Sequence, residues 1–534
     1  MKGVVVSPEP PAVVVGARIL EEGGNAFDAA VAGAVAEGVA NPFLCGLGGR
    51  GGFFCKAAGL EPKIIDCGGS IGSGERPKEW YDAVTTRAEP LSGYRIPGDK
   101  PLRGYNQIVT PGFVKGLWTV YHKYCSGKFS WAELMEPSIR LCEEGYEVYP
   151  YIAQRWVAGE DRPGAFGLAQ KYEKFPEFRR VYTKNGEPYK TGDVLAQPDY
   201  GRTLRWIAKD GGDVFYKGEM GDVIGADLEA NGSFVTREDL RNYVTYEDEP
   251  VSGWYRGYQV VSGSRGGPHV VEMLHILKHF NLSSMELNSC AYVDLVSKAM
   301  LAGFHDTTGL AGDPPHSIKK ILEQRAISEE RAAWWADRIK TGQKIFGPTL
   351  CAMDAGTTSI CAMDEAGNIV AWTHSLGGLA GCGAVTPGLG FLLNDFMGHF
   401  NPAPNRWDSM VPGKRMHGGA QVMLFRDGRP FLALGAAGGS RQHTAILQTI
   451  VNIVDFGMSV EEAVKVPRFH HEQEEILLVD PELPANSVAY MREKGLKVTK
   501  SYPLSRVQAA YRDPLTGRMH GGMDPRGGAA IVVQ

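Results

Sequence analysis

Thr357, which follows Gly356 directly, is the residue of this chain whose surroundings best suit a reactive hydroxyl. A threonine hydroxyl is a weak nucleophile without a base beside it, and no acid or histidine nearby in the sequence is obviously placed to serve. Cleavage of the Gly356–Thr357 bond would supply one, because a free α-amine has an ordinary pKa of about 7.7–8.0 and accepts a proton at neutral pH. A threonine-rich strand start is the alternative, and these residues alone leave both interpretations open.

The elements around Thr357 are predicted to form a hairpin of two buried strands. Residues 360–363 are apolar, residues 364–368 are typical of a turn, and residues 369–372 are apolar again. Side chains two residues apart in a strand point to the same face, so Thr373 and Ser375 are expected to share one. The hairpin would therefore hold hydroxyl groups close to the first residues of its opening strand.

The rest of the chain reads as a mixture of helices and strands. A strand at Val4–Val6 is followed by a helix at 12–22 and by a second helix at 26–39, whose small residues indicate close packing rather than chemistry. Further predictions are a hairpin around 255–261, a charged helix at 323–338, a helix at 444–456 and a long loop at 81–106, which could cover the active site.

A glycine-rich stretch at Cys45–Phe54 carries one arginine, Arg50. The stretch runs into Phe53 and Phe54 instead of a helix, and it lacks the Lys-Ser/Thr ending of a phosphate-binding loop. We interpret it as a loop, with Arg50 either on the surface or close to a substrate.

Composition excludes several classes of function. A net charge of −5 over 534 residues, without a run of lysines and arginines, argues against a nucleic-acid partner. No histidines cluster at metal-ligand spacing, so we expect no metal and no cofactor. No stretch reaches 18 apolar residues, so no membrane partner is expected. Nine scattered cysteines and a start unlike a signal peptide favour reduced thiols and a cytoplasmic location.

Several ordered motifs together resemble the γ-glutamyltranspeptidase family of N-terminal-nucleophile hydrolases. The motifs, which extend over nearly the whole chain, are Gly23-Gly24-Asn25-Ala26-Phe27-Asp28-Ala29-Ala30, Thr357-Thr358-Ser359, Asp364-Glu365-Ala366-Gly367-Asn368, Thr373-His374-Ser375-Leu376, Pro412-Gly413-Lys414-Arg415, Gly435 to Arg441 and Ala463 to His471.

The resemblance implies a fold and a mode of maturation. The fold would be a four-layer αββα sandwich of mixed helices and strands. Self-cleavage at Gly356–Thr357 would give a large subunit, 1–356, and a small subunit, 357–534, which form a heterodimer around one shared core, with a higher oligomer possible. Thr357 would be the nucleophile, Ser375 its supporting hydroxyl, and Gly438 and Gly439 the backbone donors to the oxyanion.

The sequence departs from the family in the residues that grip a glutamyl head group. The position of the carboxylate-binding arginine is Gly68, that of an asparagine is Gly377, and those of a serine pair are Gly418 and Gly419. The family's acidic stretch is here 392–400, which includes Phe396 and His399. A buried amine without a carboxylate partner is costly, so we expect an acyl group without the α-amine. Phe396, His399 and Arg50 would suit an aromatic, apolar or acidic acyl end, with extra volume at the replaced positions.

Three functions compete on this basis. The leading hypothesis is a self-processing amidohydrolase or acyltransferase acting on a small non-glutamyl amide. The second is a true γ-glutamyl hydrolase or transpeptidase with glutathione-type substrates, whose head-group contacts come from other residues. The third is a non-catalytic binding protein, against which the intact Thr357, Ser375, Gly438 and Gly439 argue.

Overall fold

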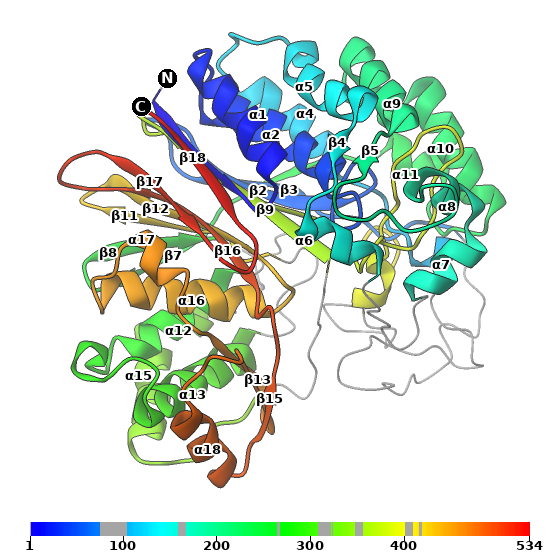
Figure 1. The fold of residues 1–534 in the computed structure, drawn as a ribbon. Helices are drawn as coiled ribbons and strands as arrows, with labels where there is room; N and C mark the ends of the chain where they lie inside the picture. The colour runs from blue at the N-terminus through cyan, green and yellow to red at the C-terminus, as the bar shows by residue number, and fades with distance from the viewer. Residues whose placement is uncertain are drawn as a thin grey trace.

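The computed structural model of this 534-residue chain describes residues 2–74, 104–157, 167–263, 267–307, 322, 324–347, 356–400, 409–415 and 419–534. Two large antiparallel sheets form its centre (Figure 1). The first has the strand order β18 (Ala529–Val533), β1 (Gly3–Ser7), β9 (Gly356–Asp364), β10 (Ile369–Gly377), β2 (Arg50–Lys56), β3 (Lys63–Cys67) and β6 (Tyr246–Asp248). The second has the order β17 (Met519–Met523), β16 (Arg506–Arg512), β12 (Arg429–Ala437), β11 (Val422–Arg426), β8 (Tyr258–Ser262) and β7 (Val251–Tyr255).

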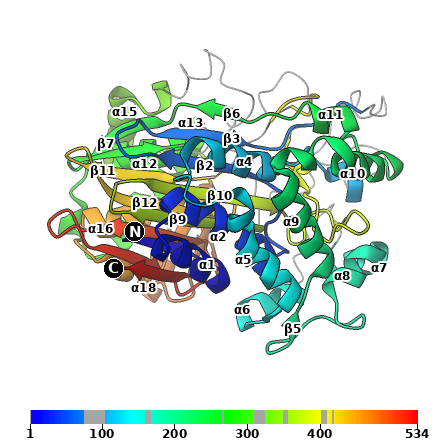
Figure 2. The ribbon, with the colours of Figure 1, turned by 90° about the horizontal axis from the view of Figure 1, so that it is seen from above.

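Helices cover the outer face of each sheet, which completes four layers (Figures 1 and 2). On the side of the first sheet lie α1 (Pro10–Glu21), α2 (Ala26–Ala40), α4 (Phe113–Tyr124), α5 (Trp131–Glu144), α6 (Pro150–Ala153), α7 (Leu168–Lys174), α8 (Pro176–Tyr182), α9 (Pro198–Asp210), α10 (Gly218–Ala230) and α11 (Arg237–Arg241). On the side of the second sheet lie α12 (Gly267–Leu277), α13 (Cys290–Thr307), α15 (Glu329–Lys340), α16 (Arg441–Val454), α17 (Val460–Ala463) and α18 (Ala485–Glu493).

Smaller elements complete the described fold. They are a three-stranded sheet of β13 (Phe469–Gln473), β14 (Ile476–Val479) and β15 (Lys497–Lys500), a short ladder of β4 (Tyr146–Glu147) with β5 (Val194–Leu195), and the 3-10 helices η1 (Gly104–Gln107), η2 (Gln154–Trp156), η3 (Gly212–Phe215), η4 (Leu282–Ser284) and η5 (Phe396–His399).

The helix α2 shows how small residues bring the first sheet and its covering layer together. Asn25 caps its N-terminus in a capping box with Asp28, and every residue of the helix is buried. A Cβ on Gly16 of α1 would lie 3.1 Å from the Ala29 carbonyl oxygen, so the two helices pack backbone to backbone. The predicted packing role of residues 26–39 is confirmed.

The two sheets meet face to face over an apolar layer. This layer includes Val4, Val6, Phe54, Ile64, Val261, Cys361, Met363, Ile369, Ala371, Met423 and Ala433. The two sheets also approach each other closely at Gly435 of β12, where a Cβ would lie 1.9 Å from the Ser359 hydroxyl on β9. The first residues of β9, Thr357 included, therefore lie at one end of the interface between the sheets.

Strands from both sides of the Gly356–Thr357 bond are interleaved in the first sheet. β1 pairs with β18 on one side and with β9 on the other, and β10 pairs with β2. The chain termini consequently lie side by side in this sheet (Figure 1). A cut at Gly356–Thr357 would leave these backbone ladders in place.

Most predicted elements appear within a few residues of their expected bounds. The helices at 12–22, 26–39 and 444–456 are α1, α2 and α16, and the hairpin at 360–372 is the longer pair β9–β10. The interpretation of Cys45–Phe54 as a loop was wrong from Arg50 onward, because β2 begins there and is hydrogen-bonded to β10 and β3. Of the expected loop at 81–106, residues 81–103 lie outside the described residues. None of the described helices is long and apolar enough to cross a membrane.

Candidate active site

Three site residues line up across the first sheet in one row. Arg50 of β2 pairs with Ser375 of β10, and Ser375 pairs with Thr357 of β9. Directly paired residues of neighbouring strands point to the same face, with strands about 4.8 Å apart. All three side chains are nearly inaccessible to solvent, with 5%, 6% and 2% exposure for Arg50, Ser375 and Thr357. The sheet therefore sets a cation, a hydroxyl and the predicted nucleophile side by side.

The Ser375 hydroxyl is hydrogen-bonded both to Thr357 and to the peptide bond that would be cut. Thr357 Oγ1 donates to Ser375 Oγ at 3.2 Å, and the Gly377 N–H donates to the same oxygen at 2.9 Å. Ser375 Oγ in turn donates to the carbonyl oxygen of Gly356. A hydroxyl has one donor and two acceptor positions, so this one is fully used. The register shift between Ser375 and Gly377 turns the Gly377 N–H toward Ser375 Oγ.

Gly438 and Gly439 lie in the turn between β12 and α16, at the same end of the sandwich. Both have positive φ, at 133° and 62°, which glycine adopts readily. Among the described residues, neither uses its N–H group in a hydrogen bond. Arg506, which pairs with Ala437, donates from Nη2 to the Thr357 carbonyl oxygen at 3.1 Å and so connects this turn to Thr357. The turn has the features that an oxyanion site requires.

Arg50, Phe396 and His399 contact one another in sequence beside the row, with the Phe396 ring in the middle. The Arg50 guanidinium carbon lies 3.7 Å from the centre of the Phe396 ring. The ring of the half-buried His399 meets Phe396 edge to face at 5.0 Å between centroids. Phe396 itself is buried with Met397, Phe400 and other apolar side chains. The structure thus brings these three predicted residues together and places Arg50 in a buried strand, not on the surface.

The expected extra volume at Gly377 is absent. A Cβ at this position would lie 1.9 Å from Asp395 Oδ1, and the φ of Gly377 is +100°. The same Asp395 oxygen accepts a hydrogen bond from the Gly378 N–H at 2.7 Å. A buried carboxylate fills the place where a larger side chain at 377 would stand, so the sequence-based expectation was wrong here.

Gly419 is similarly enclosed. A Cβ on Gly419 would lie 2.7 Å from Gln421 Nε2 and 3.5 Å from Thr373 Cβ, so no void exists there either. Gly419 therefore lies beside Thr373, whose pair with Ser359 is two pairs along the ladder from the pair of Ser375 with Thr357. Gly418 lies outside the described residues.

A buried acid–histidine pair lies on the opposite face of β9 and β10 from Thr357 and Ser375. His374 Nε2 lies 2.5 Å from Glu37 Oε2 of α2. The second oxygen of Glu37 accepts hydrogen bonds from Thr358 Oγ1 at 3.2 Å and Ser7 Oγ at 2.6 Å. The His374 ring also stacks on Phe113 of α4 at 4.5 Å. This pair fixes β9 and β10 against the helical layer directly behind Thr357 and Ser375.

Sequence reasoning missed Arg506, Asp395 and Glu37. Arg506 and Glu37 belong to no local motif with chemical meaning and reach the site from distant parts of the chain, whereas Asp395 lies within the stretch 392–400, where only Phe396 and His399 were singled out. A charged residue inside an otherwise apolar stretch was the available signal: Glu37 interrupts the small-residue helix, and Arg506 opens a buried strand.

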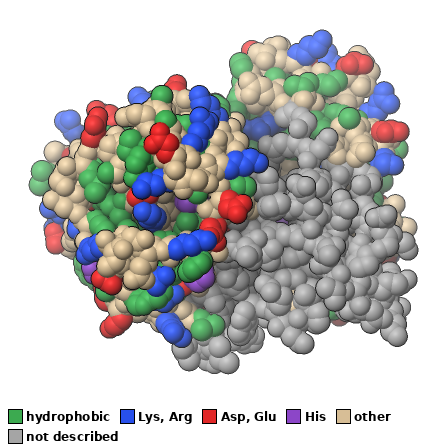
Figure 3. All heavy atoms as spheres, turned by 90° about the horizontal axis from the view of Figure 1, so that it is seen from below, with side chains coloured by type: hydrophobic (Ala, Val, Ile, Leu, Met, Phe, Trp, Pro, Cys, Tyr) green, Lys and Arg blue, Asp and Glu red, His purple; other side chains and the backbone are tan. Residues whose placement is uncertain are grey.

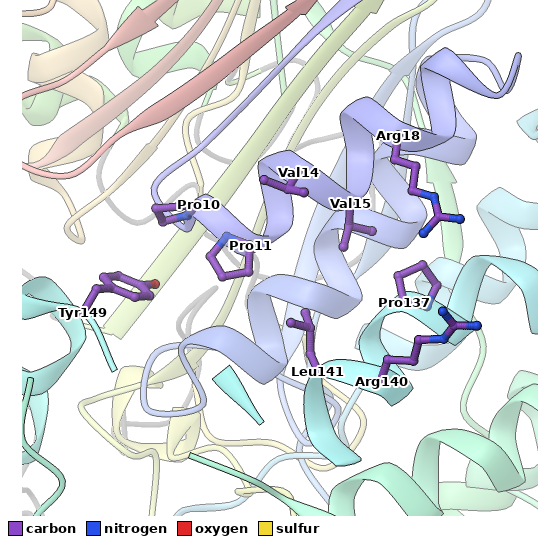
Figure 4. A pocket seen from close by; sticks show the side chains of 9 residues that line it. All are labelled: Pro10, Pro11, Val14, Val15, Arg18, Pro137, Arg140, Leu141 and Tyr149. Atoms are coloured by element: carbon purple, nitrogen blue, oxygen red, sulfur yellow. The ribbon is translucent and has the colours of Figure 1, made fainter. Parts of the chain in front are cut away.

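The described surface also carries an apolar groove away from the predicted site residues. A shallow apolar groove between α1 and α5 is lined by Pro10, Pro11, Val14, Val15, Arg18, Pro137, Arg140, Leu141 and Tyr149 (Figure 4). No predicted site residue lines it. The face seen from below carries intermingled basic and acidic side chains, without a single-sign patch in its described part (Figure 3). No metal-ligand cluster of three or more side chains occurs among the described residues.

Comparison with known proteins gives a consistent result. Residues 12–533 match the family model for γ-glutamyltranspeptidase. The chain is 31% identical to the glutathione hydrolase proenzyme of Escherichia coli K12, over 98% of this chain and 90% of that protein. It is 32% identical to the acylase ACY 1 proenzyme of Pseudomonas sp. strain SE83, over 94% and 88%. The crystal structure of cephalosporin acylase from Bacillus halodurans superposes with a TM-score of 0.86 at 27% identity, over 100% and 96%.

Proposed function

The chain belongs to the γ-glutamyltranspeptidase family, and from this premise we propose that it is a self-processing threonine-nucleophile amidohydrolase for acyl groups without the glutamyl α-amine. The observation that carries the proposal is the Ser375 hydroxyl, which accepts from Thr357 Oγ1 and donates to the Gly356 carbonyl oxygen. The named relatives are called proenzymes, which supports maturation by cleavage.

In the proposed self-cleavage, Thr357 Oγ1 attacks the carbonyl carbon of Gly356. Its proton passes to Ser375, while the Ser375 proton is donated to the Gly356 oxygen as that oxygen gains negative charge. The bond to the Thr357 nitrogen then breaks, the proton on the tetrahedral oxygen passes to that nitrogen, which becomes a free amine, and an ester remains. Water hydrolyses the ester and releases the Gly356 carboxylate, which leaves residues 1–356 and 357–534 as partners.

In turnover, the free α-amine of Thr357 takes the hydroxyl proton as Oγ1 attacks the substrate amide. The N–H groups of Gly438 and Gly439 would receive the oxyanion. The amine portion of the substrate leaves, and water or another acceptor releases the acyl group. The acyl end would lie toward Arg50 and Phe396, where a buried guanidinium favours an acidic group.

The nucleophile is tested by Thr357→Ala, with Thr357→Ser as the matched control. We expect the alanine protein to remain one chain in denaturing electrophoresis and to lose amide hydrolysis by roughly 10³-fold or more. The serine protein keeps a hydroxyl and should still be cleaved. A wild-type protein that remains uncleaved yet hydrolyses amides would contradict the assignment.

The acyl preference is tested with glutaryl, γ-glutamyl and butyryl anilides. The glutaryl compound should have the highest kcat/KM, since it keeps a terminal carboxylate and lacks the amine. Arg50→Gln should lower its kcat/KM by about 10- to 100-fold, as expected for a lost charged hydrogen bond, and should change the butyryl rate little.

A preference for the γ-glutamyl anilide would favour the second candidate, a γ-glutamyl hydrolase. Asp395 supports that candidate, because a buried carboxylate beside Gly377 could face an α-amine. The present proposal ranks first because Asp395 Oδ1 already accepts the Gly378 N–H.

A further inference from the structure

Arg506 is a buried cation in contact with the nucleophile residue. Only 3% of it is exposed, and its Nη2 donates to the Thr357 carbonyl oxygen at 3.1 Å. Its guanidinium carbon also lies 5.1 Å from the Tyr151 ring centre. Within the described part of the chain, Arg506 makes no ion pair, and its Nη1 atom has no hydrogen-bond partner. Burial lowers the pKa of Arg506, yet a guanidinium stays charged in proteins.

The carboxyl groups facing Arg506 are engaged elsewhere. Glu9 accepts from Tyr149 Oη and from Asn41 Nδ2 at 2.7 Å, and burial raises the pKa of Glu9. Asp524 is paired with Arg468 at 2.8 Å and with Arg526 at 3.1 Å. Behind the strands, Glu37 is held by His374. The remaining groups are Tyr149 and Cys45, whose pKa values burial raises, and Arg50, a second cation in the nucleophile row.

The positive charge lies close to the atom that self-cleavage would turn into an amine. The nitrogen and carbonyl oxygen of one residue are at most about 3.6 Å apart, given standard bond lengths. Arg506 Nη2 is therefore within about 7 Å of the Thr357 nitrogen. At that distance a cation in a buried site disfavours protonation of the amine by about one pH unit or more.

We propose that Arg506 is a positioning residue that fixes the Thr357 carbonyl and, through its charge, keeps the new α-amine of Thr357 in the neutral form that accepts the hydroxyl proton. This inference rests on the proposed function, since it requires a free amine at Thr357. It gives the active site a base that is already deprotonated at neutral pH, without an acid or histidine near the nucleophile in sequence.

The first test compares pH profiles of kcat/KM for Arg506→Gln and Arg506→Lys with the wild type, using the best anilide substrate. In Arg506→Gln the acidic limb should move to higher pH by about one unit or more, because the charge is gone. In Arg506→Lys, which keeps the charge, the limb should remain nearly in place. An unmoved limb in Arg506→Gln would overturn the inference.

The second test needs no variant and applies even if Arg506→Gln fails to fold or to process. The rate of carbamylation of the Thr357 amine by cyanate is followed against pH in mature wild-type protein, by mass spectrometry of its N-terminal peptide. The midpoint should fall about one unit below the ordinary 7.7–8.0 of an α-amine. A midpoint at or above 7.7 contradicts the role of Arg506 but not the assignment of Thr357 as the nucleophile. The absence of any free Thr357 amine contradicts the proposed function itself.

Discussion

At the scale of single residues, the candidate site depends on a hydroxyl and a glycine in closely packed surroundings. Ser375 satisfies one acceptor and two donors with a single hydroxyl, and Gly377 leaves room for the Asp395 carboxylate. The lost head-group residues have therefore not left an open cavity at 377 or 419.

Gly377→Asn is predicted to destabilise the protein without creating γ-glutamyl activity. The new side chain would collide with Asp395 Oδ1 and would force a φ of +100° on a non-glycine residue. We expect the free energy of unfolding to fall by about 2 kcal/mol or more, measured from urea midpoints at constant m-value.

Gly388→Asn is the matched control for this change. Gly388 also has positive φ, at +79°, but a Cβ there meets no atom within 4 Å. The loss of unfolding free energy in Gly388→Asn should therefore come from backbone strain alone, and asparagine tolerates positive φ better than most residues. Equal losses in both variants would mean that the contact with Asp395 contributes nothing.

At the scale of elements, the register of β2, β10 and β9 builds the site, and the short strand β13 supports the opposite layer. His471 of β13 is buried, and this burial lowers its pKa from 6.5 to about 4. In the unfolded chain the imidazole takes up a proton below about 6.5, while in the folded protein it does so only near 4. The stability that depends on neutral His471 is therefore present above 6.5 and is lost as pH falls from 6.5 to 4.

His471→Gln is predicted to weaken this acid sensitivity. Across the interval of about 2.5 units, the wild type should lose about 3 kcal/mol of unfolding free energy through His471, and the variant should lack that component. Urea unfolding at several pH values between 4 and 7 measures it. His122→Gln, which changes an exposed histidine, should keep the wild-type slope. A His471→Gln protein with an unchanged slope would contradict the burial argument.

At the scale of the whole molecule, the two segments on either side of Gly356–Thr357 are parts of one sandwich. β1 is hydrogen-bonded between β18 and β9, and β8 of the first segment pairs with β11 of the second. Core clusters also draw residues from both segments. Separating the segments would expose whole sheet edges and much of the apolar core.

Mature protein is therefore predicted to behave as one cooperative unit. After cleavage, both chains should elute together in size-exclusion chromatography and should unfold in a single urea transition, seen equally by fluorescence and by circular dichroism. The Thr357→Ala protein, with its intact chain, provides the reference. Dissociation of the two chains below the unfolding midpoint would show that the segments have independent cores.

The sequence by itself determined the local features of this protein. Strand alternation, capping residues and glycines act over a few positions, so the hairpin of β9 and β10, the packing helix α2 and the family motifs around Thr357 could be found without coordinates.

Only the tertiary structure decided which distant groups complete the site. Arg506 reaches Thr357 across 149 positions and Glu37 reaches His374 across 337, and no local pattern encodes such a pairing. The same holds for Arg50, whose neighbours follow from the register of three strands, and for Asp395, whose carboxylate fills the space at Gly377. Backbone preferences are local, whereas the charge and volume around a buried atom depend on how all the layers pack.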